Sequence, residues 1–164
     1  MSDYKIIDNF LSEEDWSKIY STSTRGDGIG YYINNSVATL KDYNPYHFYL
    51  THFFYEHYNI QSNHFHLIEP IIKKINPVSI VRIKSNLYPR TEKIDVHQPH
   101  TDYNFEHKAA LYMVNDNDGF TTMENGDKIQ SIANRMIFFN PQTLHSSSTC
   151  TNKKYRITIN FNYF

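Results

Sequence analysis

The sequence predicts an α+β protein that is mainly β, with helices in its first half and strands in its second. Two observations carry this prediction. Aromatic residues make up 16% of the 164 residues, among them 14 Tyr and 11 Phe, and such residues are enriched on the half-buried surfaces of sheets. From Ser79 onward, apolar residues recur at every second position, which is the period of a strand. Helices followed by strands is an α+β order.

Length, composition and charge narrow the class of protein. A chain of 164 residues buries a real core but is short for two domains. We expect a single domain over residues 1–164, with helical support over 1–77 and a β core over 78–164. The net charge of -1 comes without a basic run, which disfavours extensive nucleic-acid binding. Cys150 is the only cysteine, which excludes an internal disulfide.

The sequence shows neither a signal-peptide pattern nor an apolar stretch long enough to cross a bilayer. We therefore expect a cytoplasmic protein that does not enter a membrane.

The first half is predicted to hold a short strand and several helices. Tyr4–Ile7 has a strand pattern, and a helix follows Ser12, whose hydroxyl suits an N-cap ahead of an acidic first turn. The aromatic-rich stretch 46–58 and the stretch 65–75 are both predicted to be helical. Residues 25–30 hold three of the five glycines, which predicts a flexible loop that is available as a lid.

The second half is predicted to consist of strands that are separated by turn signals. The strand that begins near Ser79 and the last strand both alternate apolar and polar side chains. The polar positions are Arg82, Lys84, Asn86 and Tyr88 in the former and Arg156, Thr158, Asn160 and Asn162 in the latter; further strands are predicted at 109–114, 120–123, 128–132 and 135–139. Roughly eight short strands favour closure into a cupin-type jelly roll. The polar faces would then meet water or line a pocket.

The tripeptide His100-Thr101-Asp102 indicates that the polar faces line a pocket and do not simply meet water. In an extended strand, side chains alternate between the two faces, so His100 and Asp102 point the same way. With His145 they form a 2-His-1-carboxylate set, which holds non-haem Fe(II) and leaves three coordination positions open. His97 is a rival ligand, which we interpret as a loop histidine.

The same polar faces supply what an acidic co-substrate needs. A 2-oxo acid that chelates the metal takes two of the open positions and leaves one for dioxygen. Its distal carboxylate requires a fixed partner, and Arg156 can form a bidentate, charge-assisted pair with it. The hydroxyls of Tyr88 and Thr158 can bind its remaining lone pairs.

Together, these motifs resemble the iron- and 2-oxoglutarate-dependent oxygenase superfamily. The segments 7–12 and 134–139 are similar to its prolyl-hydroxylase-like branch, and 82–89 resembles its small phage-encoded members. The resemblance implies a double-stranded β-helix with N-terminal helices packed on one sheet. It also implies that iron is bound by His100, Asp102 and His145, that Arg156 holds the C5 carboxylate of 2-oxoglutarate, and that Thr158, Tyr88 and Asn86 assist.

The activity that the resemblance implies is that of a dioxygenase. It would release succinate and CO2 from 2-oxoglutarate while hydroxylating a protein or peptide side chain, a prolyl residue among the candidates, with ascorbate as a reductant. A phage-encoded member would work in the cytoplasm of a bacterial host. Two features depart from the prolyl hydroxylases: Arg156 stands where many have Lys, and 118–120 reads Asp-Gly-Phe where a Gly-Gly pair is common. A non-catalytic cupin-like protein that binds a metal or small acid, and a nucleobase-oxidising dioxygenase, remain as alternatives.

Overall fold

The computed structural model describes residues 4–38, 44 and 47–164, and most of the elements in these ranges are antiparallel strands. The strands are β1 Tyr4–Ile7, β2 Tyr32–Asn34, β3 Tyr49–Glu56, β4 Asn59–Ile60, β5 Ile80–Pro89, β6 Lys108–Met113, β7 Phe120–Met123, β8 Lys128–Gln130, β9 Arg135–Phe139, β10 His145–Ser147 and β11 Tyr155–Tyr163. The helices are α1 Glu13–Thr24 and α2 Glu69–Ile75.

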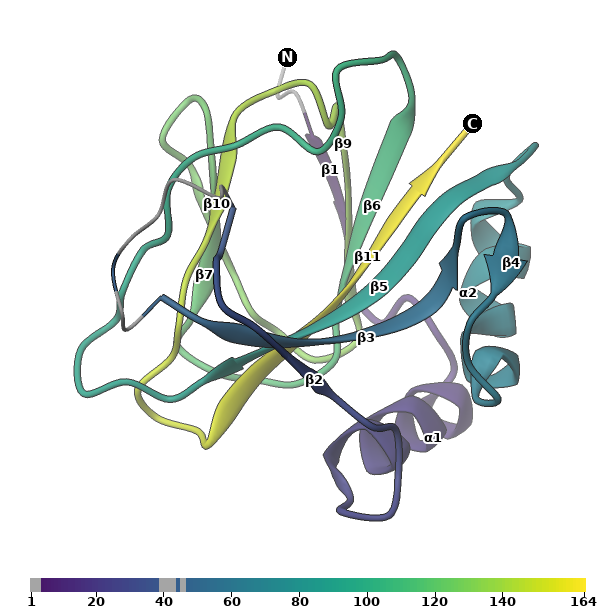
Figure 1. Cartoon of the computed structure of the whole chain (residues 1–164), viewed down its shortest axis with the longest axis horizontal. Helices are drawn as coiled ribbons and strands as arrows, with labels where there is room; N and C mark the ends of the chain where they lie inside the picture. The colour runs from purple at the N-terminus through teal and green to yellow at the C-terminus, as the bar shows by residue number, and fades with distance from the viewer. Residues whose placement is uncertain (1–3, 39–43, 45–46) are drawn as a thin grey trace.

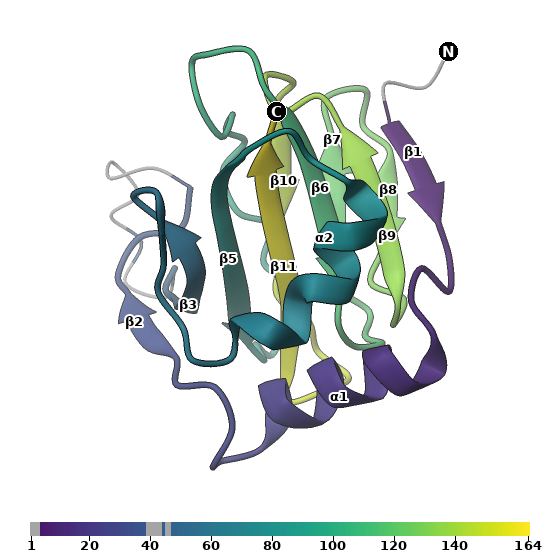
Figure 2. The ribbon, with the colours of Figure 1, turned by 90° about the vertical axis from the view of Figure 1, so that its right-hand side faces the viewer.

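The strands form two sheets that face each other (Figure 1). The larger sheet has the order β1-β9-β6-β11-β5-β3-β2, with β4 beside β3, and the smaller has the order β10-β7-β8. Both helices lie on the outer face of the larger sheet (Figure 2). The prediction of a mainly β fold with helices packed on one sheet is confirmed.

Helix α1 begins where the sequence predicts. Ser12 is its N-cap, and the Ser12 hydroxyl accepts a hydrogen bond of 3.1 Å from the backbone N–H of Asp15. Such a bond satisfies one of the free donors of the first turn. The side chain of Ile19 is buried, and Trp16 Nε1 donates to the carbonyl of Val114 at 2.9 Å. These contacts attach α1 to the sheet.

The second predicted helix, over residues 65–75, is divided. A short 3-10 segment, Phe65–Ile68, leads directly into α2. Ile68 and Ile71 are fully buried against the sheet. Asn76 ends the helix in a left-handed conformation with φ 51°, one that asparagine tolerates better than most residues. In the part of the chain that the structure describes, no helix is long and apolar enough to cross a membrane.

The helix predicted over residues 46–58 is wrong. This stretch contains β3, which pairs with β2 on one side and β5 on the other. Its alternating Tyr, Thr and Phe side chains suit a pleated surface, and pairing along both edges satisfies its backbone groups. Residue 46, the first of the predicted stretch, lies outside the described ranges.

Strands β5 and β11 lie side by side and divide the interior in two. Their apolar faces pack under the helices in one large cluster, which includes Ile83, Ile157, Ile159, Phe161 and Tyr163. Their polar faces point away from the helices. The register sets the polar residues opposite one another as Arg156–Tyr88, Thr158–Asn86, Asn160–Lys84 and Asn162–Arg82. Residues that face each other across strands lie close enough to share one site.

Candidate metal and co-substrate site

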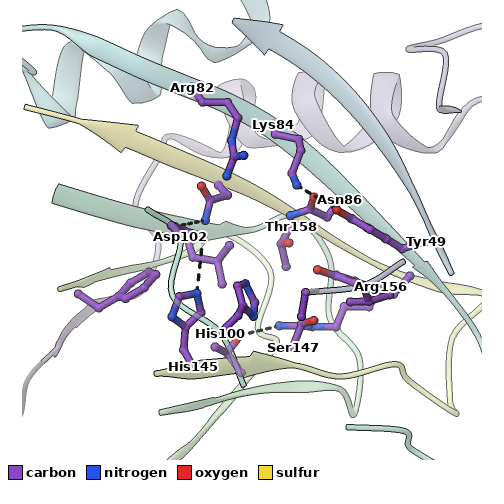
Figure 3. A pocket seen from close by; sticks show the side chains of 17 residues that line it. Tyr49, Arg82, Lys84, Asn86, His100, Asp102, His145, Ser147, Arg156 and Thr158 are labelled. Carbon is purple, nitrogen blue, oxygen red and sulfur yellow. Dashed lines mark hydrogen bonds and ion pairs between the residues drawn. The ribbon is translucent and has the colours of Figure 1, made fainter. Parts of the chain in front are cut away.

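A pocket of about 550 Å³, including its mouth, lies over the polar faces of β5 and β11. Figure 3 shows side chains from these strands, from the segment 100–102 and from β10 converging on it. All seven residues predicted for the site line this pocket, namely Asn86, Tyr88, His100, Asp102, His145, Arg156 and Thr158. The structure therefore brings together residues that are up to 72 positions apart, as the difference between 158 and 86 shows.

One ligand atom from each of His100, Asp102 and His145 lies within 4.8 Å of the others. His145 Nε2 is 3.8 Å from Asp102 Oδ1, and the two imidazole centroids are 4.6 Å apart. His145 Nδ1 lies 3.0 Å from the carbonyl oxygen of Thr143, which can only accept, so Nδ1 carries the proton. Nε2 is thereby turned toward Asp102 and the pocket. This donor set fits a divalent metal ion that is bound on one face.

The local structure around His100 differs from the predicted strand. His100 forms an isolated antiparallel bridge with His145, with backbone N···O distances of 3.0 Å in both directions. Asp102 lies at a bend, and its N–H donates to the carbonyl of Pro141 at 3.2 Å. The bridge joins two ligands directly, and the bend directs the third toward them, so the cluster forms without a regular strand.

Burial and hydrogen bonds set the charge state of this cluster. Burial, together with the neighbouring His145, lowers the pKa of His100 to about 4, so the imidazole is neutral at pH 7. Burial alone would raise the pKa of Asp102, but His145, the hydrogen bond from Asn162 and the charge of Arg82 outweigh it and hold that pKa below its usual value. A neutral imidazole at His100 and an ionised carboxylate at Asp102 are the states in which these groups bind a metal ion.

Asn162 fixes the orientation of the carboxylate. Its Nδ2 donates to Asp102 Oδ2 at 2.7 Å and lies 3.2 Å from His107 Nε2. Asn160 Nδ2 adds a longer bond of 3.3 Å to the same oxygen. Oxygen Oδ1 is left facing His145. The strand alternation identified both asparagines as polar-face residues, but their bonds to Asp102 depend on long-range pairing.

Arg156 is fully buried at the inner end of the pocket. Its guanidinium donates to Ser131 Oγ at 2.7 Å, Thr121 Oγ1 at 2.8 Å and the carbonyl of Ser148 at 3.2 Å. All of these partners are neutral, and no carboxylate among the described residues pairs with it. Burial lowers its pKa to about 10, so it remains cationic at neutral pH. A buried cation without a counter-ion is costly.

Gly119 makes room for Arg156. A Cβ at this position would lie 2.7 Å from Arg156 Cδ and 2.6 Å from the carbonyl oxygen of Thr149. A side chain here would therefore displace the arginine or the backbone. Gly119, the one glycine of the segment 118–120, therefore leaves the room that the Arg156 side chain needs to enter the pocket.

The remaining predicted residues surround Arg156 and the centre of the pocket. The ring of Tyr88 lies 5.6 Å from the guanidinium carbon and stacks on Tyr49 at 5.5 Å. Thr158 is 1% exposed, and the buried Asn86 Oδ1 has no hydrogen-bond partner among the described residues. An unpaired buried amide oxygen that lines a pocket is available to a ligand.

Two other expectations concern loops. His97 lies outside the cluster, stacked on Tyr88 at 5.3 Å and with Nδ1 2.8 Å from Ser147 Oγ.

The lid predicted at residues 25–30 is wrong, because this loop closes on α1 through the bond from Ile29 N to Thr22 O and does not line the pocket. The described residues 34, 36, 37 and 38 line the site instead, which the sequence did not indicate.

Comparison with known proteins gives different results for sequence and structure. Neither a protein-family model nor a curated protein matches the sequence. Among solved structures, a viral collagen prolyl hydroxylase from Paramecium bursaria Chlorella virus-1, in complex with 2-oxoglutarate, matches with a TM-score of 0.63 at 14% identity. That alignment covers 98% of this chain and 95% of the viral one.

Two further structures extend the comparison. A prolyl hydroxylase from Trichoplax adhaerens, in complex with a peptide of hypoxia inducible factor, gives a TM-score of 0.66 at 13% identity over 99% of this chain and 83% of that one. A 2OG-Fe(II) oxygenase family oxidoreductase from Burkholderia pseudomallei gives 0.72 at 10% identity over 98% and 84%. The chain therefore has the double-stranded β-helix fold of the 2-oxoglutarate–Fe(II) oxygenases, as the resemblance in sequence implied.

Proposed function

We propose that this chain is an Fe(II)- and 2-oxoglutarate-dependent dioxygenase. The observation that carries the proposal is Arg156, a fully buried cation with neutral partners only, in the same pocket as a two-histidine, one-carboxylate cluster. A metal ion beside the cluster and a bound acid beside the arginine would compensate both charges. 2-Oxoglutarate has the chemistry to meet both demands, because its oxo acid end chelates metals and its other end is a carboxylate.

The roles of the residues follow from their positions. His100, Asp102 and His145 would hold Fe(II), and Arg156 would hold the C5 carboxylate, with Thr158, Tyr88 and Asn86 beside the co-substrate. When bound, the metal and 2-oxoglutarate supply the oxidising chemistry, in which one atom of O2 enters succinate as CO2 leaves and the other enters a C–H bond of the substrate. Asn162 keeps Asp102 oriented. The surrounding aromatic rings keep water away from Arg156.

The proposed prime substrate is a protein or peptide side chain, with a prolyl residue as the first to test. Two of the structures that share the fold are prolyl hydroxylases, and one of them holds a peptide. The net charge of -1 favours a peptide over a nucleic acid.

The experiment is incubation of the protein with Fe(II), 2-oxoglutarate and ascorbate, with and without proline-containing peptides. We expect succinate to form, more of it with an accepted peptide, and none when a chelator removes the metal. Under anaerobic conditions, 2-oxoglutarate added to the Fe(II) protein should give a visible charge-transfer band, which reports chelation. Absence of both metal binding and 2-oxoglutarate binding would contradict the proposal, whereas the band without oxygen consumption would favour a non-catalytic binding protein.

A further inference from the structure

Arg82 and Lys84 add two positive charges to the pocket that the proposed metal ion and 2-oxoglutarate would not neutralise. Both side chains extend from the polar face of β5 into the pocket, Arg82 toward Asp102 and Lys84 toward Tyr49 (Figure 3). Among the described residues, the lining contains three cationic side chains, Arg82, Lys84 and Arg156, and one carboxylate, Asp102. A divalent metal ion and the two carboxylates of 2-oxoglutarate would cancel each other, so two positive charges would remain uncompensated in the loaded site.

Neither of these cations is ion-paired within the described residues. Lys84 Nζ donates to Tyr49 Oη at 3.1 Å and lies over the rings of Tyr49 and Phe53. Arg82 donates through one terminal nitrogen to Asn162 Oδ1 at 3.3 Å, while its buried Nε has no partner. An unsatisfied buried N–H on a cation is costly, and these donors are therefore available to a ligand.

Asp102 and Glu56 act on these cations through space, but among the described residues neither carboxylate forms a direct ion pair with them. The two oxygens of Asp102 face His145 and the amides of Asn160 and Asn162. Glu56, at the end of β3, acts on Lys84 through space but lies outside the pocket lining, with His57 at 3.5 Å as its ion-pair partner.

The cations are also too far from Arg156 to bind the same carboxylate. Along β11, Arg156 and Asn162 are six residues apart, and Asn162 lies opposite Arg82. At roughly 3.3 Å per residue, this separation is about 20 Å along the strand. Lys84 lies opposite Asn160, four residues or about 13 Å from Arg156 along the same strand. A 2-oxoglutarate molecule whose C5 carboxylate is held by Arg156 does not bring that carboxylate to either residue, so both cations are available to another molecule.

A second hollow provides the space for that molecule. It adjoins the metal-ligand cluster and is lined mostly by polar side chains, among them Asn34, Ser36, Arg82, Lys84 and Thr101. It shares Arg82, Lys84, His100 and Asp102 with the main pocket. A ligand in this hollow would therefore lie beside the metal and opposite the co-substrate.

We propose that the prime substrate carries a carboxylate, which Arg82 and Lys84 bind in this second hollow while the carbon to be oxidised lies next to the metal ligands. The inference rests on the proposed function, because it assigns that site its substrate class. The carboxylate is either an acidic side chain of a peptide or the carboxylate of a free amino acid. Arg suits such a group because its planar fork binds both oxygens.

The test measures binding to protein loaded with Zn(II) and 2-oxoglutarate, which does not turn over. One set of probes pairs terminally blocked pentapeptides that have a central Glu or Gln, together with a phosphoserine version. The other set pairs free L-amino acids with their α-amides. Saturation-transfer NMR and calorimetry should show that, in one of the two sets, the acid binds at least about tenfold more tightly than its amide. A preference within the pentapeptides identifies an acidic side chain as the source of the carboxylate, and a preference within the free amino acids identifies the α-carboxylate.

Variants connect this preference to the two cations. Arg82→Gln and Lys84→Gln should each remove most of the preference, Arg82→Lys should keep most of it, and the exposed Lys153→Gln should change nothing. The affinity for 2-oxoglutarate should stay within about twofold of the wild type in all four, and thermal unfolding checks that each is folded. Equal binding of acids and amides, no binding in either set, a preference for phosphoserine, or a tenfold loss of 2-oxoglutarate affinity in Arg82→Gln would each overturn the inference. Failure of the wild type to bind 2-oxoglutarate, which is measured first, would instead contradict the proposed function.

Discussion

The two faces of β11 are equally buried but differ in chemistry. Ile157, Ile159 and Phe161 on the outer face are at most 2% exposed, and they pack against the helices. On the inner face, Arg156 and Asn162 are fully buried as well. The outer face gains free energy as apolar surface leaves water. The inner face loses the hydration of its polar groups and must replace it with specific partners.

The partners of the inner face show what it is for. Asn162 binds Asp102, and the partners of Arg156 among the described residues are all neutral, three oxygen atoms and the Met113 sulfur. The first contact orients a metal ligand, and the second leaves a positive charge for an acid. The outer face therefore stabilises the fold, whereas the inner face retains a cost that bound ligands would remove. The comparison predicts that substitutions on the two faces separate binding from stability.

The largest effect is expected for Asp102→Ala. Two imidazoles without a charged ligand hold Fe(II) weakly, so the loss of metal affinity should exceed the roughly 10- to 100-fold that follows removal of an outer partner. Metal titration of the wild type and of the variant measures this, with the exposed Asp27→Ala as the matched control. Unaltered metal affinity in Asp102→Ala would show that the carboxylate ligand lies elsewhere.

The next effect is one of stability and comes from the outer face. Ile159→Ala leaves a cavity beneath the helices and should lower the free energy of unfolding by about 3 kcal/mol. Its neighbour Thr158 points into the pocket, so Thr158→Val should weaken 2-oxoglutarate binding with a smaller change in stability. Denaturant unfolding and 2-oxoglutarate titration of both variants measure the two effects. The comparison fails if Ile159→Ala weakens ligand binding more than Thr158→Val does.

Much of this two-faced arrangement was predictable from the sequence. The alternation along β5 and β11 assigned Arg82, Lys84, Arg156 and Asn162 to one side, and the pairing of the strands confirms that assignment. Strand alternation follows from the local geometry of the backbone, so one sequence is enough to detect it. The cluster of His100, Asp102 and His145 was predicted through the same argument and through the resemblance to a known superfamily.

The errors concern features that depend on distant parts of the chain. The stretch 46–58 was predicted to be helical, but β3 is stabilised by its pairing with β2 and β5. His100 and Asp102 do not lie on a regular strand, since their positions depend on the bridge to His145 and on the carbonyl of Pro141. Tertiary contacts override local propensity in such cases.

Replacement of Arg156 tests the inner face at its charged end. Arg156→Gln keeps a polar side chain but removes the cation, so the affinity for 2-oxoglutarate should fall roughly 100-fold, as for the loss of one partner of a buried charge pair. Metal affinity should be unchanged, because Arg156 lies outside the ligand cluster. Calorimetric titration measures both affinities, and the exposed Arg90→Gln is the matched control. A fall in metal affinity of similar size would mean that the variant disturbs the whole pocket.

The smallest effect is expected for Asn162→Leu, and its size depends on pH. Asn162 stabilises the ionised form of Asp102 by a hydrogen bond of 2.7 Å and so helps to hold its pKa below the usual value. Without this bond, burial raises the pKa of Asp102, and protons compete better with the metal. Metal affinity should therefore fall about tenfold, with a larger deficit at pH 5.5 than at pH 7.5. A deficit that does not change with pH would mean that Asn162 acts on the packing of the pocket and not on the charge of Asp102.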